Sequence, residues 1–225
     1  MKTFRLFILP ILLPLLFNLK AYNEKELKVA LSTKTCENCN LVGINMKDGN
    51  LSLSGIHGTN LDKANFSYSN LNGCDFRGLN LSESNLQYSS MNGMYLSRAN
   101  LEKADMRYAQ AKGSDFCKTN LKDASLQNTD FSGSIFLDIK NLETAHCNEK
   151  TKLPIGYDCV NGKVKIVDCS EKRKLPIGYY CKEGIVKPLL LPIEGCPDEI
   201  LNDPSPQEYY NYFEGLKNKV LQKEE

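Results

Sequence analysis

The sequence predicts an all-β fold, a quadrilateral β-helix of about five coils, on the strength of three regularities. Every fifth residue from Leu41 to Phe136 is apolar through 20 consecutive registers, and Ala111 is the smallest of these residues. The residue two places before each register is Ala, Ser, Thr, Gly or Cys in 17 of the 20 cases. Chemically similar residues also recur at a spacing of 20 along the same stretch.

The period of five defines the shape of one coil. It matches neither the 3.6-residue repeat of an amphipathic helix nor the two-residue alternation of a half-buried strand. A chain that turns inward every five residues describes a polygon, so we expect Phe76 and Leu81 inside it and Ser82 outside. The residue before each register is Asn or Asp in 14 of 20 cases. We expect these residues at the corners, because they bond nearby backbone and tolerate left-handed conformations.

The spacing of 20 makes the polygon a square. Four pentapeptides then form one coil, and residues 20 apart are neighbours in a stack with the ~4.8 Å spacing of adjacent strands. One column holds a tyrosine in three successive coils, which predicts an exposed aromatic ladder: Tyr68, Tyr88 and Tyr108. The preceding column alternates in charge: Lys63, Glu83, Lys103 and Asp123. Stacked rings and alternating charges stabilise neighbours of this kind.

These registers resemble the pentapeptide-repeat family, whose members fold as right-handed quadrilateral β-helices. The resemblance covers residues 36–140, and its clearest stretch reads GTNLDKANFSYSNLNGCDFRGLNLSESNL. Some members of the family bind DNA gyrase as acidic mimics of duplex DNA, and the balanced charge of this chain argues against that activity. Three large residues depart from the small-residue rule: Ile44, Leu79 and Met94.

Residues 1–21 predict a cleaved secretory signal peptide. Lys2 and Arg5 precede an apolar run from Leu6 to Phe17, and Ala21 is a small residue suited to cleavage. The run is shorter than the ~20 residues that span a bilayer. We therefore expect export to the periplasm or the extracellular space, or to the thylakoid lumen if the source is a cyanobacterium. No stable membrane insertion is expected after cleavage.

Charge and composition narrow the class of function. Cleavage would remove three of the 28 basic residues and none of the 27 acidic ones, which leaves a net charge of −2. A nearly neutral chain argues against nucleic-acid binding through a basic face. With two histidines and no recognisable catalytic, phosphate-binding or cofactor-binding set, the sequence predicts neither an enzyme nor a cofactor.

The segments that flank the repeat predict covers for its two ends. Residues 22–35 can form a short capping helix over the N-terminal end, where an open β-helix exposes strand edges. Residues 141–188 contain two copies of one sequence, CNEKTKLPIGYDCVNGKV and CSEKRKLPIGYYCKEGIV, at an offset of 22. Each copy ends in a turn signal, Asn161-Gly162 or Glu183-Gly184, and this predicts a pair of small hairpins.

Four of the nine cysteines belong to this duplication: Cys147, Cys159, Cys169 and Cys181. An exported protein can form disulfides, and the 12-residue spacing without a Cys-x-x-Cys pair disfavours a metal site here. The duplication favours the pairs Cys147–Cys159 and Cys169–Cys181, although four cysteines allow three connectivities. The odd total leaves at least one unpaired or intermolecular cysteine. The sequence does not predict whether five of the cysteines are disulfide-bonded: Cys36, Cys39, Cys74, Cys117 and Cys196.

The tail, residues 189–225, predicts a linker and an amphipathic helix that begins after Ser205. Its apolar stripe has helical spacing: Tyr209, Phe213, Leu216 and Val220. Such a stripe packs on its own protein, or it forms a homodimer contact or binds a partner helix.

Two functions from different classes remain. The first is a non-enzymatic exported binding or scaffolding protein with an unknown protein partner. The tyrosine ladder is its candidate contact surface, unless the ladder only stabilises the stack. The alternative is a redox or metal-binding protein that uses the Cys36-x-x-Cys39 pair.

Overall fold

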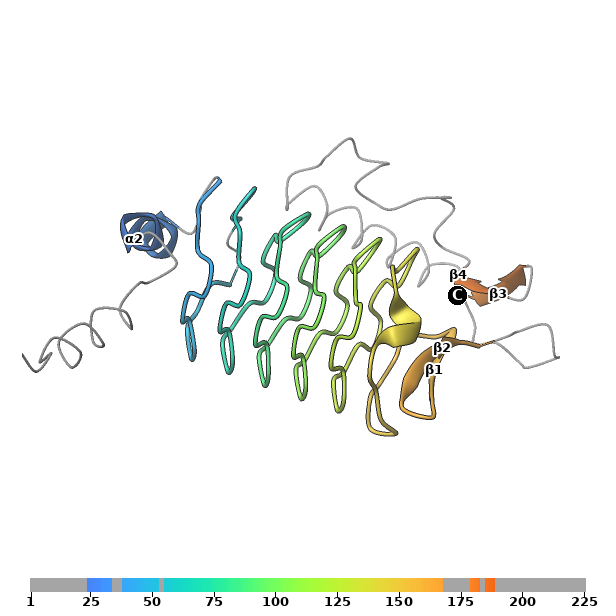
Figure 1. Cartoon of the computed structure of the whole chain (residues 1–225). Coiled ribbons are helices and arrows are strands. Elements are labelled where there is room, and N and C mark those ends of the chain that lie inside the picture. Colours follow the sequence, from blue (N-terminus) through green and yellow to red (C-terminus); the bar gives the residue numbers. More distant parts are fainter. Residues whose placement is uncertain (1–23, 34–37, 53–54, 168–178, 183–184, 189–225) are drawn as a thin grey trace, which may run out of the picture.

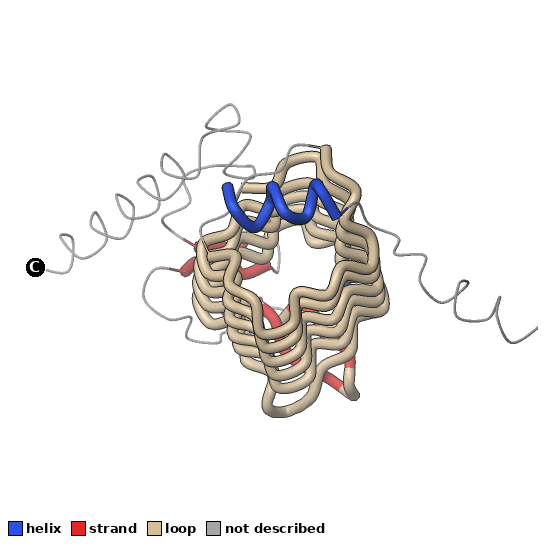
Figure 2. Tube along the Cα trace, turned by 90° about the vertical axis from the view of Figure 1, so that its left-hand side faces the viewer, coloured by secondary structure: helices blue, strands red, loops and turns tan. Residues whose placement is uncertain are grey.

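The computed structural model describes residues 24–33, 38–52, 55–167, 179–182 and 185–188 (Figure 1). In the coils, residues that precede a register form isolated parallel β-bridges with residues 20 places further on, from Asn40–Asn60 to Asn120–Lys140. These bridges form four columns, one for each side of the coil. The predicted β-helix with four pentapeptides per coil is therefore confirmed, and Figure 2 looks along its stacked coils.

The corners differ from the expectation based on Asn and Asp. The left-handed residue of each corner stands two places after the register, as Lys63 (φ 56°) and Gly73 (φ 65°) do. The Asn and Asp residues lie instead in the β-bridges, and their Oδ1 atoms accept a hydrogen bond from the backbone N–H two residues on. Asn85 accepts such a bond from Gln87 at 3.1 Å. These side chains therefore stabilise the turn that follows them. Asn and Asp are frequent here because of this hydrogen bond, and not because they adopt a left-handed conformation.

The interior is filled as the pattern predicts. Phe76 and Leu81 are fully buried, and the large residues Leu79 and Met94 are buried in the small-residue columns as well. Hydroxyl groups in those columns donate to backbone carbonyls, as Thr119 Oγ1 does to the carbonyl of Leu96 at 2.7 Å. A buried hydroxyl without a partner would be destabilising, and these bonds remove that cost.

A helix covers the N-terminal end. Helix α2, Glu24–Thr33, lies along the upper edge of the opening of the first coil (Figure 2), within the range predicted for a capping helix. Its Leu27 packs against the core, and the Glu26 carboxylate accepts a hydrogen bond from the N–H of Asn40 at 2.8 Å. The apolar opening beneath it is lined by core residues that include Leu41 and Ile44.

At the other end the β-helix continues beyond residue 140, where the sequence pattern placed its boundary. Ser125 pairs with His146 and Asp130 with Lys152, so the offset grows from 20 to 21 and then 22. The short 3-10 helix η1, Leu142–Thr144, lies in this coil. Its extra residues destroy the period of five while the backbone pairing persists. The assignment of residues 141–152 to the hairpin segment was therefore wrong.

Both predicted hairpins form. Strand β1, Tyr157–Val160, pairs antiparallel with β2, Lys163–Ile166, and β3, Tyr179–Lys182, pairs in the same register with β4, Ile185–Pro188. In the first hairpin both turn residues are left-handed, Asn161 at φ 52° and Gly162 at φ 75°, as a tight hairpin turn requires.

The first hairpin also closes the end of the core. Its Tyr157 donates a hydrogen bond to the carbonyl of Phe136, and the two rings lie 5.4 Å apart. Burial raises the pKa of Tyr157 to about 12. The predicted signal peptide (1–21), the turn at 183–184 and the predicted tail helix lie outside the described residues.

Candidate binding surface

The three tyrosines of the predicted ladder stack upon one another. Ring centroids are 4.8 Å apart between Tyr68 and Tyr88 and 4.7 Å apart between Tyr88 and Tyr108, with planes within 6° of parallel. The side chains remain 54%, 45% and 44% exposed. The stack covers both ring faces of Tyr88 and the inner faces of Tyr68 and Tyr108, so the exposed surface consists mainly of ring edges and hydroxyl groups. The predicted geometry of the tyrosine ladder is confirmed.

These tyrosines occupy an unfavourable backbone conformation. All three are left-handed, with φ between 57° and 63°, in the column where Asn128 stands one coil further on. A left-handed conformation costs a residue other than Gly, Asn or Asp roughly 1–2 kcal/mol. Ring stacking between coils offsets part of that cost, so the tyrosine ladder contributes to the stability of the rod as well as to its surface.

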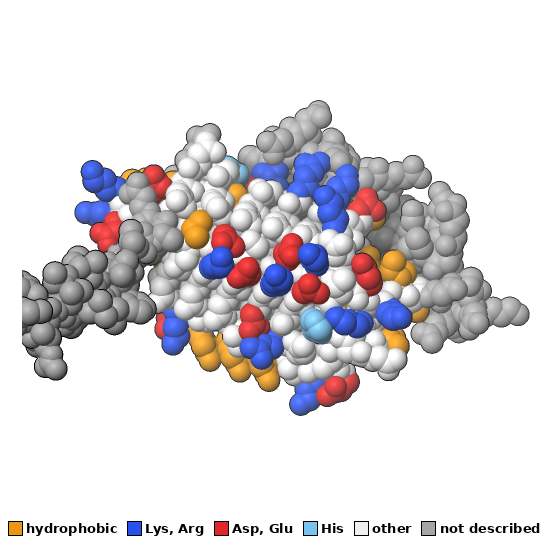
Figure 3. Space-filling view, in the orientation of Figure 1, with side chains coloured by type: hydrophobic (Ala, Val, Ile, Leu, Met, Phe, Trp, Pro, Cys, Tyr) orange, Lys and Arg blue, Asp and Glu red, His pale blue; other side chains and the backbone are white. Residues whose placement is uncertain are grey.

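Charged residues of both signs border the tyrosine ladder. Lys47 Nζ lies 5.6 Å from the ring centroid of Tyr68, which is a cation–π contact. In the preceding column Lys63 Nζ lies 3.9 Å from Glu83 Oε2, as the alternating charges predict. Figure 3 shows a row of hydrophobic side chains along the lower edge of the rod beside rows of basic and acidic side chains. The surface is therefore an apolar ridge between mixed charges.

An Asp-x-Arg motif adds a further charged pair that the sequence analysis missed. Arg107 Nη2 lies 2.6 Å from Asp105 Oδ2, and this hydrogen bond is the main reason why the pKa of Arg107 is raised. Tyr108 and Tyr88 raise it further. The repeated spacing in Asp75-Phe76-Arg77 and Asp105-Met106-Arg107 could have revealed both pairs.

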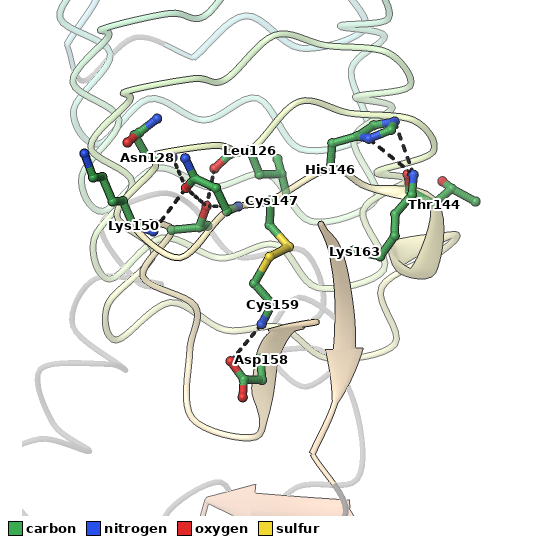
Figure 4. The surroundings of a disulfide bond; sticks show 11 residues. Leu126, Asn128, Thr144, His146, Cys147, Lys150, Asp158, Cys159 and Lys163 are labelled. Carbon is green, nitrogen blue, oxygen red and sulfur yellow. Dashed lines mark hydrogen bonds between the residues drawn. A yellow bond between two sulfur atoms is a disulfide. The ribbon is translucent and has the colours of Figure 1, made fainter. Parts of the chain in front are cut away.

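The predicted disulfide Cys147–Cys159 is present, with Cα atoms 5.9 Å apart. It joins the last coil to β1, and the neighbouring His146 lies beside Lys163 instead of the sulfur atoms (Figure 4). Cys169 lies outside the described residues and the side chain of Cys181 is not described, so the pair Cys169–Cys181 stays a prediction.

The other described cysteines differ in state. Cys39 and Cys117 are disulfide-bonded, whereas Cys74 is a buried thiol, with its Sγ 2.8 Å from the carbonyl oxygen of Leu51. Cys39 is 7% exposed, and Cys36 lies outside the described residues. Across the described part of the chain, no group of three or more His, Cys, Asp or Glu could hold a metal ion.

Asp130 holds the irregular last coil in place. Its carboxylate accepts hydrogen bonds from Ser132 Oγ at 2.6 Å and from Lys152 Nζ at 3.1 Å, and Lys112 Nζ lies 3.4 Å away. Burial acts to raise the pKa of Asp130, but the bonds from Ser132 and Lys152 outweigh burial and hold the pKa at about 2.

Asp130→Asn is expected to lower the free energy of unfolding by about 2 kcal/mol at neutral pH. Because the folded pKa lies below the unfolded value of ~3.9, the carboxylate stabilises the fold above about pH 4. That contribution is lost as the pH falls through the folded pKa. Urea unfolding of both proteins between pH 2 and 7 measures it. A difference that stays constant down to pH 2 would contradict the assignment.

The comparisons with known proteins agree with this geometry. The family described as pentapeptide repeats (8 copies) matches residues 35–67, 59–93, 80–116 and 99–136. The chain belongs to the pentapeptide-repeat family. Its fold is the right-handed β-helix of that family. No curated protein sequence matches the chain.

Several solved structures resemble this pentapeptide-repeat protein. Rfr23 from the cyanobacterium Cyanothece 51142 is 21% identical with a TM-score of 0.45, and the match covers 57% of this chain and 97% of Rfr23. A pentapeptide-repeat protein of the Arabidopsis thaliana thylakoid lumen is 22% identical with a TM-score of 0.34, covering 43% and 68%. QnrB1, a plasmid-mediated fluoroquinolone resistance protein, is 19% identical with a TM-score of 0.34, covering 55% and 78%. In the part of this protein that the structure describes, no helix is long and apolar enough to cross a membrane.

Proposed function

We propose that this pentapeptide-repeat protein is an exported, non-catalytic scaffold that binds a protein partner through its tyrosine ladder. The observation that carries the proposal is the exposure of three aligned rings, Tyr68, Tyr88 and Tyr108, on a regular rod. Tyrosine is enriched among the residues that contribute most to protein interfaces. Because stacking already holds each ring in one orientation, the tyrosine side chains would lose little conformational entropy when a partner binds.

The chemistry of the ridge favours a protein over a nucleic acid. Nucleobases bind to aromatic residues by stacking on exposed ring faces. Here neighbouring rings cover both faces of Tyr88 and the inner faces of Tyr68 and Tyr108, and Lys47 lies over the Tyr68 ring. Edges and hydroxyl groups offer apolar contact and hydrogen bonds together, as tyrosine does in protein interfaces. The bordering charges, Lys63–Glu83 and Asp105–Arg107, carry both signs and so suit a partner of mixed charge.

The cysteines support export. Cys39, Cys117 and the pair Cys147–Cys159 are all disulfide-bonded. Disulfides of this structural kind persist in oxidising compartments and are rare in the reducing cytosol. Together with the signal-like residues 1–21, they favour a periplasmic, lumenal or extracellular location.

A triple substitution tests the contact surface. Tyr68→Asn, Tyr88→Asn and Tyr108→Asn together should remove the rings and keep the corners, because Asn128 is left-handed in the same column. We expect a partner recovered with the wild-type protein from the exported fraction to bind the triple variant at least about tenfold more weakly, since interface tyrosines often contribute 2 kcal/mol or more.

A matched control separates the rings from the backbone. Lys103→Asn changes a left-handed corner residue of the neighbouring column without removing a ring, and it should leave the affinity within about threefold, because border charges contribute little. Equal affinity of the wild-type and triple variants would exclude the tyrosine ladder as the contact. Recovery of the chain in the cytosol with free thiols would contradict export.

A further inference from the structure

One side of the square connects the charged column to the tyrosine ladder, and we call this side the ladder face. In each coil it runs from one left-handed corner to the next, as from Lys63 to Tyr68. Parallel β-bridges such as Asn65–Asn85 hold successive coils in register along it. The two columns that border it are exposed, apart from the half-buried Asp123. The ladder face therefore presents its charges and its rings at one common spacing, the ~4.8 Å that separates neighbouring coils.

The charged column alternates in sign from coil to coil, and this alternation matches a reversed copy of the column. Its members are, in order, Lys63, Glu83, Lys103 and Asp123. A two-fold rotation about an axis midway between Glu83 and Lys103 reverses the direction of the rod. Lys63 then faces Asp123 of a second copy, and Glu83 faces Lys103 of that copy. Every charge of the column therefore meets an opposite charge, in the two-fold arrangement that is commonest among homo-oligomers.

The same alternation disfavours the neighbouring registers. If the second copy slips by one coil along the rod, the two-fold axis passes through Glu83 or through Lys103. Each charge of the column that still overlaps the other column then faces a like charge, and such contacts are destabilising. A slip of two coils restores opposite signs, but it leaves fewer coils in contact. The charges therefore select one register of the antiparallel pair.

The tyrosine ladder fits the same two-fold axis. The rotation places Tyr88 opposite Tyr108 of the second copy, with their exposed edges and hydroxyl groups toward each other. Between the two borders, Arg107 comes to face Gln87 of the second copy, and a guanidinium can donate a hydrogen bond to a side-chain amide oxygen. The rings would supply contact area, as aromatic residues do in protein interfaces. The charges would decide which partner and which register are accepted.

We infer that the partner of the tyrosine ladder is a second copy of this chain, bound antiparallel through the ladder face with Glu83 opposite Lys103. The inference rests on the proposed function, in which the tyrosine ladder is a protein contact, and it names the partner. Any other protein would have to present opposite charges at the spacing of the coils, and a second copy does so because it has the same fold. Exposed ion pairs contribute little attraction, so neutralisation of Lys103 should change the affinity little. Reversal of its charge introduces repulsion and should have a larger effect.

Charge reversal tests the register with variants that keep the corners. Lys103→Glu and Glu83→Lys exchange two residue types that are already left-handed in this column, at φ 57° and 55°. Both variants should therefore fold, which circular dichroism checks. Each variant alone places like charges opposite each other twice in the antiparallel dimer. Sedimentation equilibrium over a concentration series at low salt should show self-association of the wild type, weakened at least about tenfold in either variant.

A mixture of the two single variants gives the sharpest readout. In the mixed dimer the central positions again carry opposite charges, so association should return to within about threefold of the wild type. Lys103→Glu and Glu83→Lys combined in one chain should restore it too, and that chain has the net charge of the wild type. Lys28→Glu is the matched control, because it changes the net charge as Lys103→Glu does but lies on helix α2, outside the ladder face. It should leave self-association unchanged.

A wild-type protein that stays monomeric throughout the series, or a mixture that associates as weakly as the single variants, would overturn the inference. The triple variant Tyr68→Asn, Tyr88→Asn and Tyr108→Asn separates this result from failure of the proposed function. If the wild type is monomeric and the triple variant binds a recovered partner more weakly, the tyrosine ladder is a contact for a different protein. If the triple variant self-associates and binds a recovered partner as the wild type does, the proposed function fails as well.

Discussion

Phe76→Ala is expected to lower the free energy of unfolding by about 3–5 kcal/mol, the range for deletion of a large buried aromatic side chain. Phe76 is fully buried, and its ring centroid lies 6.0 Å from that of Phe66. The backbone around it cannot collapse into the space, because its N–H is bonded to the carbonyl of Tyr95 in the next coil at 2.9 Å. Urea denaturation followed by circular dichroism measures the change.

Ser82→Ala is the matched control on the outer side of the wall. The sequence predicts that substitution here costs no more than about 0.5 kcal/mol. In the structure Ser82 is half-buried, and its Oγ lies 2.7 Å from both Asp62 Oδ1 and Asn80 Oδ1. Loss of these bonds raises the expected cost to about 1 kcal/mol, still well below that of Phe76→Ala. Equal costs for the two variants would mean that the inward register is wrong.

Simultaneous replacement of Cys147 and Cys159 by serine is expected to lower the free energy of unfolding by about 2–4 kcal/mol. The disulfide closes a short loop and holds the first hairpin against the last coil, where Cys147 also donates its N–H to the carbonyl of Gly162 at 3.0 Å. Without it, the last coil would lose the cover that protects its strand edges. Denaturant unfolding of both proteins without reductant measures the effect.

Cys74→Ser controls for the replacement of sulfur by oxygen. Cys74 is a buried thiol, and a serine hydroxyl could donate to Leu51 as the hydroxyls of the other small residues do to their carbonyls. We expect a change below about 1 kcal/mol, because the partner of the bond is kept. If the double variant unfolds no more easily than Cys74→Ser, the disulfide does not hold the end of the rod.

Much of the fold was predictable because its strongest interactions repeat along the sequence. An apolar side chain every fifth residue is sufficient to specify an inward-facing position, and the tyrosines at 68, 88 and 108 specify the size of the coil. Each coil contacts mainly its two neighbours, so the same local rule applies at every step. The two copies of the duplicated segment could be recognised because they also repeat. Their comparison predicted the two hairpins and the disulfide Cys147–Cys159.

The corners show where local preference misled. Asn and Asp tolerate left-handed backbone, yet lysine, arginine and tyrosine occupy that conformation here, as Lys63 and Tyr68 do. Bonds between coils, such as that from the N–H of Tyr68 to the carbonyl of Gln87 at 2.9 Å, impose the conformation on whichever residue stands there. Tertiary pairing therefore overrides the preference of the single residue.

The sequence by itself determined the repeating rod, its coil size, the hairpin disulfide and the tyrosine ladder. Only the tertiary structure extended the last coil to Lys152 across the irregular segment at η1, because backbone pairing tolerates inserted residues that abolish a period. Only the tertiary structure also distinguished Asp75–Arg77 from Asp105–Arg107, which the sequence presents as equivalents. Periodicity specifies the neighbours of a residue along the stack, whereas the exposure of its side chain depends on the assembled surface around it.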